Sequence, residues 1–493
     1  MTNGAGIPPA RERLEREDDP MHLDEMILVS VDDHVCEPPD MWHGRLAAKW
    51  KDRAPRLVHK RDGTDVWVFE GQQMPNIGVN AVAGRPLEEY GMEPTALAQI
   101  RAGCYDVNAR VGDMSVSGIL GSLCFPSFPG LSGELFNQQQ DKELARAMIE
   151  AYNDWHIDGW CGAYPGRFIP LVLPMMWDPE LLAGEVRRVA RKGCHAMTFS
   201  GNPASTGYPS LHSAHWDPFW KACADEGTVV CMHIGSGTGM SFDDPDCPAE
   251  ILIASVPIGL FHSAMTLVYS QALRKFPNLK IALSEGGIGW IPYFLERADY
   301  TYQHHRHWTH QSFGDKLPSD VFREHIIVCF IDDLAGVRNR DLIGVDTITW
   351  ECDYPHSDST WPNAPERLWE ALAGVPDDEI NKITHRNAMR HFQYDPFAHR
   401  PPAQCTVAAL RAEATDVDLS LKHGSGGIPP SAYEHGFVTV GDLLKQLATT
   451  YATPAEDAGQ SMCAAEAEAR VVALGKNLRG APPARGGDDP AAR

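Results

Sequence analysis

The sequence predicts a (β/α)₈ barrel, and three observations support this fold class. Eight short runs rich in apolar and β-branched residues recur along the chain, helical patterns often follow them, and no glycine-rich dinucleotide motif follows the first run. Most of these runs are apolar throughout and do not alternate with polar residues, as expected of parallel strands that are covered on both faces. An open, doubly wound sheet is the alternative that the same alternation allows.

The predicted strands span residues 26–34, 117–125, 167–175, 194–200, 227–235, 279–287, 325–333 and 346–354. Two of the intervening helices have clear boundaries. Asp178 and Pro179 are expected to open one helix as N-cap and first helical residue, and Gly193 follows its end. The Asp-Pro pair that begins at Asp217 is expected to open another helix in the same way, with Gly227 at its end.

Four parts are predicted along the chain: a flexible leader (1–25), the barrel (26–395), a C-terminal extension (396–474) and a disordered tail (475–493). Residues 50–110 separate the first two strands and are too long for a simple connection, so they predict an inserted lid or subdomain. The extension is expected to wrap the barrel or a neighbouring subunit. It is compatible with a homodimer or a higher homo-oligomer.

The charge and residue composition of the chain indicate which kinds of molecule it is expected to bind. The chain has 66 acidic and 43 basic side chains and a formal charge of -23, which disfavours nucleic acid and anionic membranes. No run approaches the roughly 20 apolar residues that span a bilayer, and the N-terminal segment MTNGAGIPPARERLEREDDP lacks the apolar stretch of a secretory signal. The 12 cysteines are scattered without a C-x-x-C pair, as in reduced proteins. We therefore expect a cytoplasmic protein that acts on a small molecule.

Polar side chains stand at the carboxyl ends of four predicted strands, where barrel enzymes gather their catalytic groups. Asp32 and His34 end the first strand, His233 the fifth, Glu285 follows the sixth, and Asp353 ends the eighth. Because residues i and i+2 of a strand share a face, Asp32 and His34 can both point into the barrel mouth. Aspartate oxygens and histidine nitrogens bind divalent metals. The sequence thus predicts one metal ion, with an open position for water or substrate, on four ligands: Asp32, His34, His233 and Asp353.

Each ligand also has a structural explanation when taken alone. A D-x-H triplet occurs by chance, His233 could be a hydrogen-bonded core histidine, and Asp353 could cap a turn before Pro355. Their joint position at the ends of strands one, five and eight favours the metal.

Four segments carry a resemblance to a known family: VSVDDHVCEPPDMW, CMHIGSG, FPNLKIALSEGGIGWIPYFLERAD and ECDYPHSDSTWP. They resemble the amidohydrolase-related family, which includes aminocarboxymuconate-semialdehyde decarboxylase and the γ-resorcylate-type decarboxylases. The resemblance runs from about residue 26 to 395. It implies the same metal ligands, with Asp353 also handling protons.

Two departures from the family pattern bear on the chemistry. The family often begins with His-x-His, whereas Asp32 stands first here, so the ion could be Mn²⁺ or Mg²⁺ rather than Zn²⁺. The family's sixth strand often ends in His-Gly-Gly, and here Glu285 replaces the histidine. Glu285 could do the same proton transfer if its pKa were raised towards neutrality.

The main functional hypothesis is a metal-dependent hydrolase, in which a metal-activated water attacks an amide, ester or ring carbonyl of a small cyclic or aromatic substrate. Asp353 would remove the proton of that water, and Glu285 is the second catalytic candidate. The alternative is non-oxidative decarboxylation of an aromatic carboxylate, with Asp353 or Glu285 protonating the ring. A catalytically inactive, ligand-binding barrel is the third hypothesis.

Four further residues are candidates for substrate binding or for supporting the ligands. Glu37 could hydrogen-bond a metal ligand or be a loop carboxylate between prolines, and His356 could reach the substrate or lie on a surface loop. Trp42 and Trp290 could wall an aromatic substrate or be plain packing.

Overall fold

The computed structural model describes residues 21–61, 63–75, 81–91, 96–237, 242–423 and 429–452. The predicted tail at 475–493 lies outside these ranges, as do residues 1–20 of the predicted leader and 453–474 of the predicted extension. Leu23–Glu25, at the end of the predicted leader, form a short 3₁₀-helix.

All eight predicted strands are present and run parallel: β1 (Leu28–His34), β5 (Ile119–Phe125), β6 (Phe168–Ile169), β7 (Ala196–Thr198), β8 (Val229–His233), β9 (Lys280–Ser284), β10 (Ile326–Phe330) and β11 (Ile348–Trp350). Their order, β6-β5-β1-β11-β10-β9-β8-β7, is chain order read around a ring. The ring closes beyond β6, where Val172 N donates to Ala196 O (3.2 Å) and accepts through its carbonyl from Thr198 N (3.0 Å). The predicted (β/α)₈ barrel is confirmed.

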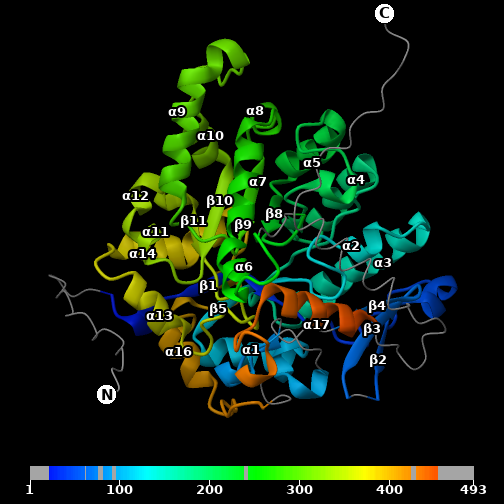
Figure 1. Ribbon diagram of the computed structural model, residues 1–493. Coiled ribbons are helices and arrows are strands. Elements are labelled where there is room, and N and C mark those ends of the chain that lie inside the picture. The colour runs from blue at the N-terminus through cyan, green and yellow to red at the C-terminus, as the bar shows by residue number, and fades with distance from the viewer. Residues whose placement is uncertain are drawn as a thin grey trace, which may run out of the picture.

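Helices surround the strands (Figure 1). They are α1 (Val107–Val116), α2 (Glu134–Asn137), α3 (Lys142–Asp154), α4 (Pro179–Ala190), α5 (Asp217–Glu226), α6 (Ala249–Ser255), α7 (Ile258–Tyr269), α8 (Ala272–Lys275), α9 (Ile291–Thr309), α10 (Pro318–His325), α11 (Leu334–Arg338), α12 (Arg340–Ile343), α13 (Ala364–Ala371), α14 (Asp377–Asn381), α15 (Asn387–His391), α16 (Val407–Glu413) and α17 (Val440–Ala452). Long, amphipathic α3 and α4 bury one face each against the barrel, as covering helices of this fold do.

Both predicted helices are present, with Gly227 after the second, but only one of the two predicted N-caps is confirmed. Asp178 caps α4, accepting from the backbone N–H groups of Glu180 and Leu181 at 3.0 Å each. Asp217 does not cap α5; a preceding 3₁₀-helix runs directly into α5, so Trp216 takes the N-cap position. The Asp217 carboxylate instead accepts from Lys275 Nζ at 2.7 Å.

The segment between β1 and α1 carries a second, antiparallel sheet of β2 (Arg56–His59), β3 (Asp65–Phe69) and β4 (Gln72–Pro75). Trp67 of β3 stacks on Phe128, in the loop after β5, with ring centroids 4.3 Å apart. This contact holds the small sheet against the carboxyl-terminal side of the barrel. A role as a lid stays a prediction.

The C-terminal extension packs on the barrel itself. Val407 N donates to Met26 O at 2.8 Å, beside the start of β1, and Leu410 packs with Leu120 of β5. Further along, α17 contacts β4, and its residue Val440 packs with Leu252 of α6.

One sequence expectation needs correction at α6 and α7. Residues Ala249–Tyr269 form a stretch with a mean hydropathy of 1.9, long and apolar enough to cross a membrane by length and composition alone. Pro257 divides it into two helices, and Leu260, Ala264 and Leu267 of α7 are buried in the core. The sequence argument missed the stretch because small and hydroxyl residues interrupt its aliphatic runs.

The barrel interior is filled by alternating apolar side chains, among them Val29, Val31, Leu123, Phe125, Ile169, Val229, Cys231, Ala282, Ile327 and Cys329. Phe392 and Tyr394, after α15, pack with them. This layer lies below the strand ends that carry the predicted ligands. The eleven cysteines among the described residues are all free, as expected of reduced thiols.

Candidate metal centre

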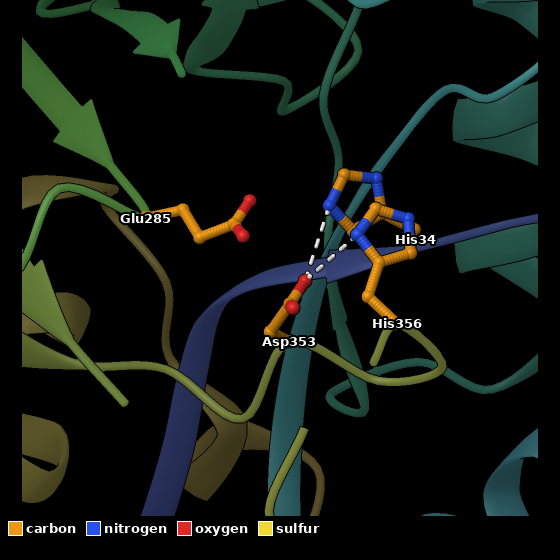
Figure 2. A group of neighbouring side chains, drawn as sticks. All are labelled: His34, Glu285, Asp353 and His356. Carbon is orange, nitrogen blue, oxygen red and sulfur yellow. Dashed lines mark ion pairs between the residues drawn. The ribbon is translucent and has the colours of Figure 1, made fainter. Parts of the chain in front are cut away.

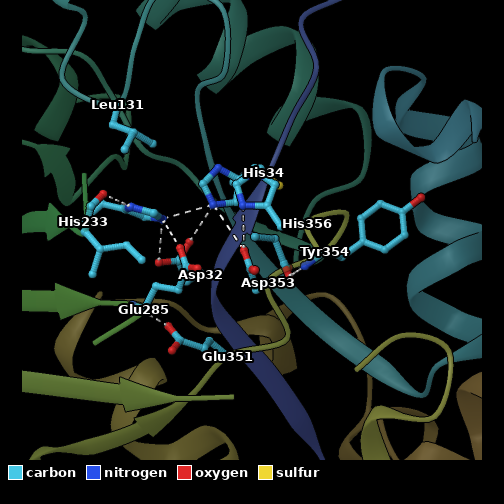
Figure 3. A network of polar contacts seen from close by, with 12 residues as sticks. Asp32, His34, Leu131, His233, Glu285, Glu351, Asp353, Tyr354 and His356 are labelled. Carbon is cyan, nitrogen blue, oxygen red and sulfur yellow. Dashed lines mark hydrogen bonds and ion pairs between the residues drawn. The ribbon is translucent and has the colours of Figure 1, made fainter. Parts of the chain in front are cut away.

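The structure brings the four predicted ligands together at the carboxyl ends of β1, β8 and β11 (Figure 3). His34 Nε2 lies 3.4 Å from Asp32 Oδ1, 3.3 Å from Asp353 Oδ1 and 3.1 Å from His233 Nε2. His233 Nε2 lies 3.4 Å from Asp32 Oδ2. Ligands that share one ion at about 2.1 Å lie roughly 3–3.4 Å from their neighbours. The cluster therefore has the dimensions of a single cation site.

A shift in the pairing of β1 sets which side chains face inward. Ser30 pairs with Ser122 of β5, but the next pair is Asp33 with Cys124, so β1 holds one extra residue in this interval. Val29 and Val31 pack inside the barrel, and the extra residue lets Asp32 and His34 face inward as well. Asp33 is left facing outward, where it accepts from Tyr354 N at 2.9 Å.

His233 and Asp353 reach the cluster by different routes. On β8, Val229 and Cys231 already face the interior, so regular alternation carries His233 inward. Asp353 follows β11 with a φ of 59°, and Glu285 follows β9 with a φ of 60°. Side chains with a Cβ adopt this left-handed conformation at a cost of about 1–3 kcal/mol, and such residues concentrate at functional sites.

The carboxylates of Asp32 and Asp353 have no donor in hydrogen-bond geometry among the described residues, although the Ser284 side chain lies close enough to offset part of the rise in the pKa of Asp32. Both oxygens of Asp32 and both of Asp353 are buried and lack a donor. Burial raises the pKa of each carboxyl well above its usual range, and repulsion by the neighbouring carboxylates of Glu285 and Glu351 adds to this effect. A buried carboxylate without a donor is costly unless a cation binds it.

The Nε2 atoms of His34 and His233 meet at the centre of the cluster, 3.1 Å apart. His233 Nδ1 lies 2.6 Å from the Ile234 carbonyl oxygen, which can only accept, so Nδ1 carries a proton and Nε2 is the atom left to bind a metal. Burial lowers the pKa of His34 well below its usual range and that of His356 to about 4. Neutral imidazoles beside donor-free carboxylates make up a donor set suited to one divalent metal ion.

Glu285 and His356 complete the ring around this point (Figure 2). Glu285 Oε2 lies 3.1 Å from His233 Nε2, and His356 Nδ1 lies 3.2 Å from Asp353 Oδ1. The ligand atoms of His34, Glu285, Asp353 and His356 all lie within 4.8 Å of one another, as do those of Asp32, His34 and His233. His356 is thus a member of the cluster and not a surface loop residue.

Three other predicted residues lie away from the cluster. Glu37 accepts from the backbone N–H groups of Ser127 (2.9 Å) and Phe128 (3.0 Å) and from the Tyr152 hydroxyl (3.0 Å), so it fastens the loop after β5. Trp42 packs edge-on against Phe128 and is buried.

Trp290 supports the turn that carries Glu285. Its indole Nε1 donates to the Gly286 carbonyl oxygen at 2.9 Å, and its ring packs against Phe261 and Phe294. The histidine-rich run of α9 lies at the surface of that helix, where His304 and His307 are exposed.

Glu351 was missed by the sequence argument. It is fully buried directly after β11, two residues before Asp353, and its Oε2 accepts from Glu285 N (3.1 Å) and Cys329 Sγ (2.6 Å). Burial raises its pKa to about 8, and Oε1 has no donor among the described residues. Strand alternation back from Asp353 would have found it.

A cavity of about 580 Å³ opens beside the cluster. Glu285, Glu351 and His356 are among the residues that line it. Five of its lining residues are apolar and are called the apolar wall below: Ile234, Ile253, Val256, Pro257 and Ile331. Three further lining residues are acidic: Asp332, Asp333 and Asp358. Asp333 is already satisfied by the N–H groups of Ile288, Gly289 and Gly336, whereas Asp358 is exposed.

Comparison with solved structures shows the same fold. An amidohydrolase from Mycobacterium avium subsp. paratuberculosis is 20% identical, with 74% of this chain and 99% of that chain covered and a TM-score of 0.57. 5-Carboxyvanillate decarboxylase LigW from Sphingomonas paucimobilis is 20% identical, covering 75% and 100%, with a TM-score of 0.51. The 5-carboxyvanillate decarboxylase of Novosphingobium aromaticivorans, solved with manganese, is 18% identical, covering 76% and 99%, with a TM-score of 0.53.

Comparison at the level of sequence gives the family. No curated protein matches the chain. The profile of the amidohydrolase family matches residues 110–393, which is more than half of the 493 residues and includes His233, Glu285 and Asp353. Asp32 and His34 precede the matched range, and the fold alone brings them to the same centre. The chain belongs to the amidohydrolase family and is an enzyme of that superfamily.

Proposed function

We propose that this protein is a metal-dependent carboxy-lyase that removes carbon dioxide from an aromatic carboxylate. Asp32, His34, His233 and Asp353 hold the ion in this proposal. The observation that carries it is the apolar share of the lining of the cavity that Glu285 and His356 also line: Ile234, Ile253, Val256, Pro257 and Ile331.

The apolar wall suits both the substrate and the reaction. An aromatic ring that packs on it buries apolar surface at about 25 cal/mol per Å². Decarboxylation turns a charged carboxylate into neutral carbon dioxide, so apolar surroundings disfavour the reactant relative to the product.

The roles of the side chains follow from their positions. A divalent ion held by these four ligands would supply positive charge to the oxygens of the substrate. Asp353 and Glu285 approach the centre from different strands, and either can deliver a proton to the ring carbon that bears the carboxylate. The carbon–carbon bond then breaks, its electron pair restores the ring, and the carboxylate recovers a proton from water in the cavity.

The relatives support the proposal and the choice of metal. Two of the three fold relatives described above act as 5-carboxyvanillate decarboxylases, and one of them holds manganese. In this chain the first ligand is the carboxylate of Asp32, and its oxygen favours Mn²⁺ or Mg²⁺ over softer metals.

The test is release of carbon dioxide by Mn²⁺-loaded protein from a panel of hydroxybenzoates, followed by gas-phase mass spectrometry and by loss of the aromatic acid on chromatography. We expect release from at least one ortho-hydroxylated member, and none after chelation of the metal. Absence of release across the panel, together with cleavage of amides, esters or lactones, would overturn the proposal.

Hydrolysis is the second candidate, and the carboxylates that line the cavity favour it. Glu285, Glu351 and Asp358 line the cavity, and no lysine or arginine does so among the described residues. The internal segments outside the described ranges contain no lysine or arginine either. A neutral or cationic amide, ester or lactone meets less repulsion there than an anion does, and Asp353 could take a proton from water. Cleavage of such a substrate without carbon dioxide release would select this candidate.

A further inference from the structure

We propose that the substrate is an aromatic carboxylate whose ring carries an apolar substituent ending in a cationic group, and that Asp358 binds this group. The substituent is called the arm below. The inference rests on the proposed function, because it keeps the carboxylate of the substrate at the metal centre and assigns the opposite end of the molecule. The observations that carry it are the size of the cavity, the residues that line it and two of its carboxylates.

The cavity is larger than a single aromatic ring requires. Its volume is about 580 Å³. A cavity of about 150 Å³ is enough to hold benzene. A hydroxybenzoate at the metal centre therefore leaves most of the space to water, whereas a ring with an arm fills more of it. The residues that line the cavity indicate which kind of arm fits.

The lining residues range from fully buried to exposed. Glu351 is fully buried, and the side chains of Glu285 and His356 are 13% and 16% exposed. Ile253 is 55% exposed, and Asp358 is exposed as well. The end of a bound molecule that lies nearest to solvent therefore meets an isoleucine and an aspartate.

The apolar wall fits the middle of the arm. Ile234 directly follows the metal-centre residue His233, whereas Ile253 belongs to α6 and Pro257 precedes α7. All three line the same cavity. Methylene groups that cover this wall leave water, and each one that is fully buried tightens binding by about four-fold.

The charges of the lining select a cation at the end of the arm. Asp332 is paired with Arg367, and Asp333 accepts from three backbone N–H groups. Asp358 has the Ser357 side chain beside it but no cation among the described residues. An ammonium group on the arm supplies that cation, and a second carboxylate in its place meets repulsion from the acidic lining.

Asp358 lies near the metal centre. Burial raises the pKa of the Asp358 carboxyl, and repulsion by Glu285 adds to the rise. Burial raises the pKa of Asp353 as well, and repulsion by Asp358 is one of the further causes. Carboxylates affect each other in this way only at short range. One substrate molecule can therefore reach the metal centre with its carboxylate and Asp358 with its arm.

Glu351 is an independent sign that the cavity takes a polar ligand. Its Oε2 accepts two hydrogen bonds, whereas Oε1 is buried and has no partner among the described residues. Buried polar atoms without a partner are rare in folded proteins. Because Glu351 lines the cavity, a hydroxyl or amine group of the substrate can provide the missing partner.

The first test measures the binding of three salicylates to the Mn²⁺-loaded protein by calorimetry. Each carries a propyl arm on the ring, ending in an ammonium, a hydroxyl or a carboxylate group, and the set is made with the arm at ring carbon 4 and again at carbon 5. In at least one set, the ammonium compound should bind about three- to five-fold more tightly than the hydroxyl compound, as expected of a partly exposed ion pair. The carboxylate compound should bind most weakly. Equal affinities in both sets, or tightest binding of the carboxylate compound, would overturn the proposal.

The second test assigns the preference to Asp358. Asp358→Asn keeps the shape of the side chain and should abolish the preference for the ammonium compound, while binding of the hydroxyl compound changes by less than about two-fold. Asp332→Asn is the matched control, because Asp332 lines the same cavity but is paired with Arg367, and it should keep the preference. Loss of the preference in both variants, or in neither, would contradict the role of Asp358. Thermal melts show whether each variant is folded.

The third test concerns the apolar part of the arm. Lengthening the arm from one to four methylene groups should tighten binding by up to about four-fold at each step. Ile253→Ser should reduce this gain. Ile251→Ser is the control, since Ile251 is 46% exposed on the same helix and does not line the cavity. Affinity that is independent of arm length, or an equal effect of both variants, would refute the contact with the apolar wall.

These binding measurements need no turnover, so they separate the arm from the proposed function. Absence of carbon dioxide release from every compound, with an ammonium preference that Asp358→Asn abolishes, would refute the function and leave the cation site. Carbon dioxide release without any preference among the three arms would do the reverse.

Discussion

Two polar networks lie on opposite faces of β1, and they differ in whether the buried aspartate has hydrogen-bond donors. On the inner face, Asp32 is buried with no hydrogen-bond donor among the described residues. On the outer face its neighbour Asp33 is buried too, but it accepts from Tyr354 N and Ser122 Oγ, and Arg110 lies close enough to lower its pKa. Burial still raises the pKa of Asp33 to about 6.

Arg110 shows how complete the outer network is. Its Nε donates to Gly103 O at 2.6 Å, and Nη2 donates to the backbone carbonyl of His34. Its guanidinium lies 4.4 Å from the centre of the Tyr354 ring, and the Tyr354 hydroxyl donates to Asp113 at 2.6 Å. Saturated polar groups of this kind stabilise a fold. The comparison teaches that the unsaturated face of β1 is the one arranged for a ligand.

The largest effect is expected from Asp353→Asn on the inner face. Loss of the charge and of the proton-transfer group should lower kcat/KM by about 10²–10⁴-fold, while the fold survives because the side-chain shape is kept. Asp341→Asn, on the exposed surface of α12, is the control. Steady-state kinetics on the substrate found in the panel, with circular dichroism, measures both. Full activity would remove Asp353 from the chemistry.

Arg110→Met tests the outer face and should act on stability. It leaves the buried Asp33 carboxylate without its cation, so the free energy of unfolding should fall by about 3–5 kcal/mol. Urea denaturation measures this, with the exposed Arg297→Met of α9 as a control that should stay within about 0.5 kcal/mol. A neutral effect of Arg110→Met would mean that the outer network is not what holds this part of the fold.

The buried carboxyl of Glu37 should make the stability of the fold depend on pH. Burial raises its pKa from 4.5 to about 7 despite hydrogen bonds from Phe128, Ser127 and Tyr152. The folded state therefore holds the proton to higher pH than the unfolded state, so stability falls as pH rises from about 4.5 to about 7 and is constant above that. The total is about 3 kcal/mol. Glu37→Gln should lack this slope in urea denaturation between about pH 5 and pH 8. A constant difference between the two proteins would show that Glu37 does not titrate there.

Asp32→Asn should have the smallest effect and the opposite sign to Arg110→Met. In metal-free protein it removes a buried charge without a donor, so the free energy of unfolding should rise by about 1–3 kcal/mol. Mn²⁺ at about a hundred times its Kd should add about 2.7 kcal/mol to the unchanged protein and much less to the variant. Urea denaturation of both proteins, with chelator and with Mn²⁺, measures these free energies of unfolding. A variant that is less stable without metal would contradict the contrast between the two faces.

The sequence predicted the barrel because each strand is a short apolar run, and it predicted Asp32, His34, His233 and Asp353 because polar residues end otherwise apolar strands. It could not predict the extra residue in β1, since the pairing of two strands depends on the partner strand.

Other features also depend on contacts that the chain makes at a distance. The place of His356 follows from stacking on His34, which is far away in sequence, and the failure of Asp217 as a cap follows from the 3₁₀-helix before it. Glu37 was chosen for its proximity to the ligands in sequence, whereas its hydrogen bonds fix the loop after β5.

The pairing of β1 with β11 joins the first and last strands of the barrel, and Asp353 N donates to Asp32 O across this seam at 2.9 Å. The donor set therefore draws on both ends of a span of more than 300 residues. During synthesis, a nascent chain cannot assemble the centre until Asp353 has left the ribosome. The complete four-ligand set can therefore form only after the last strand is made, and an ion bound there would link the first and last strands of the barrel.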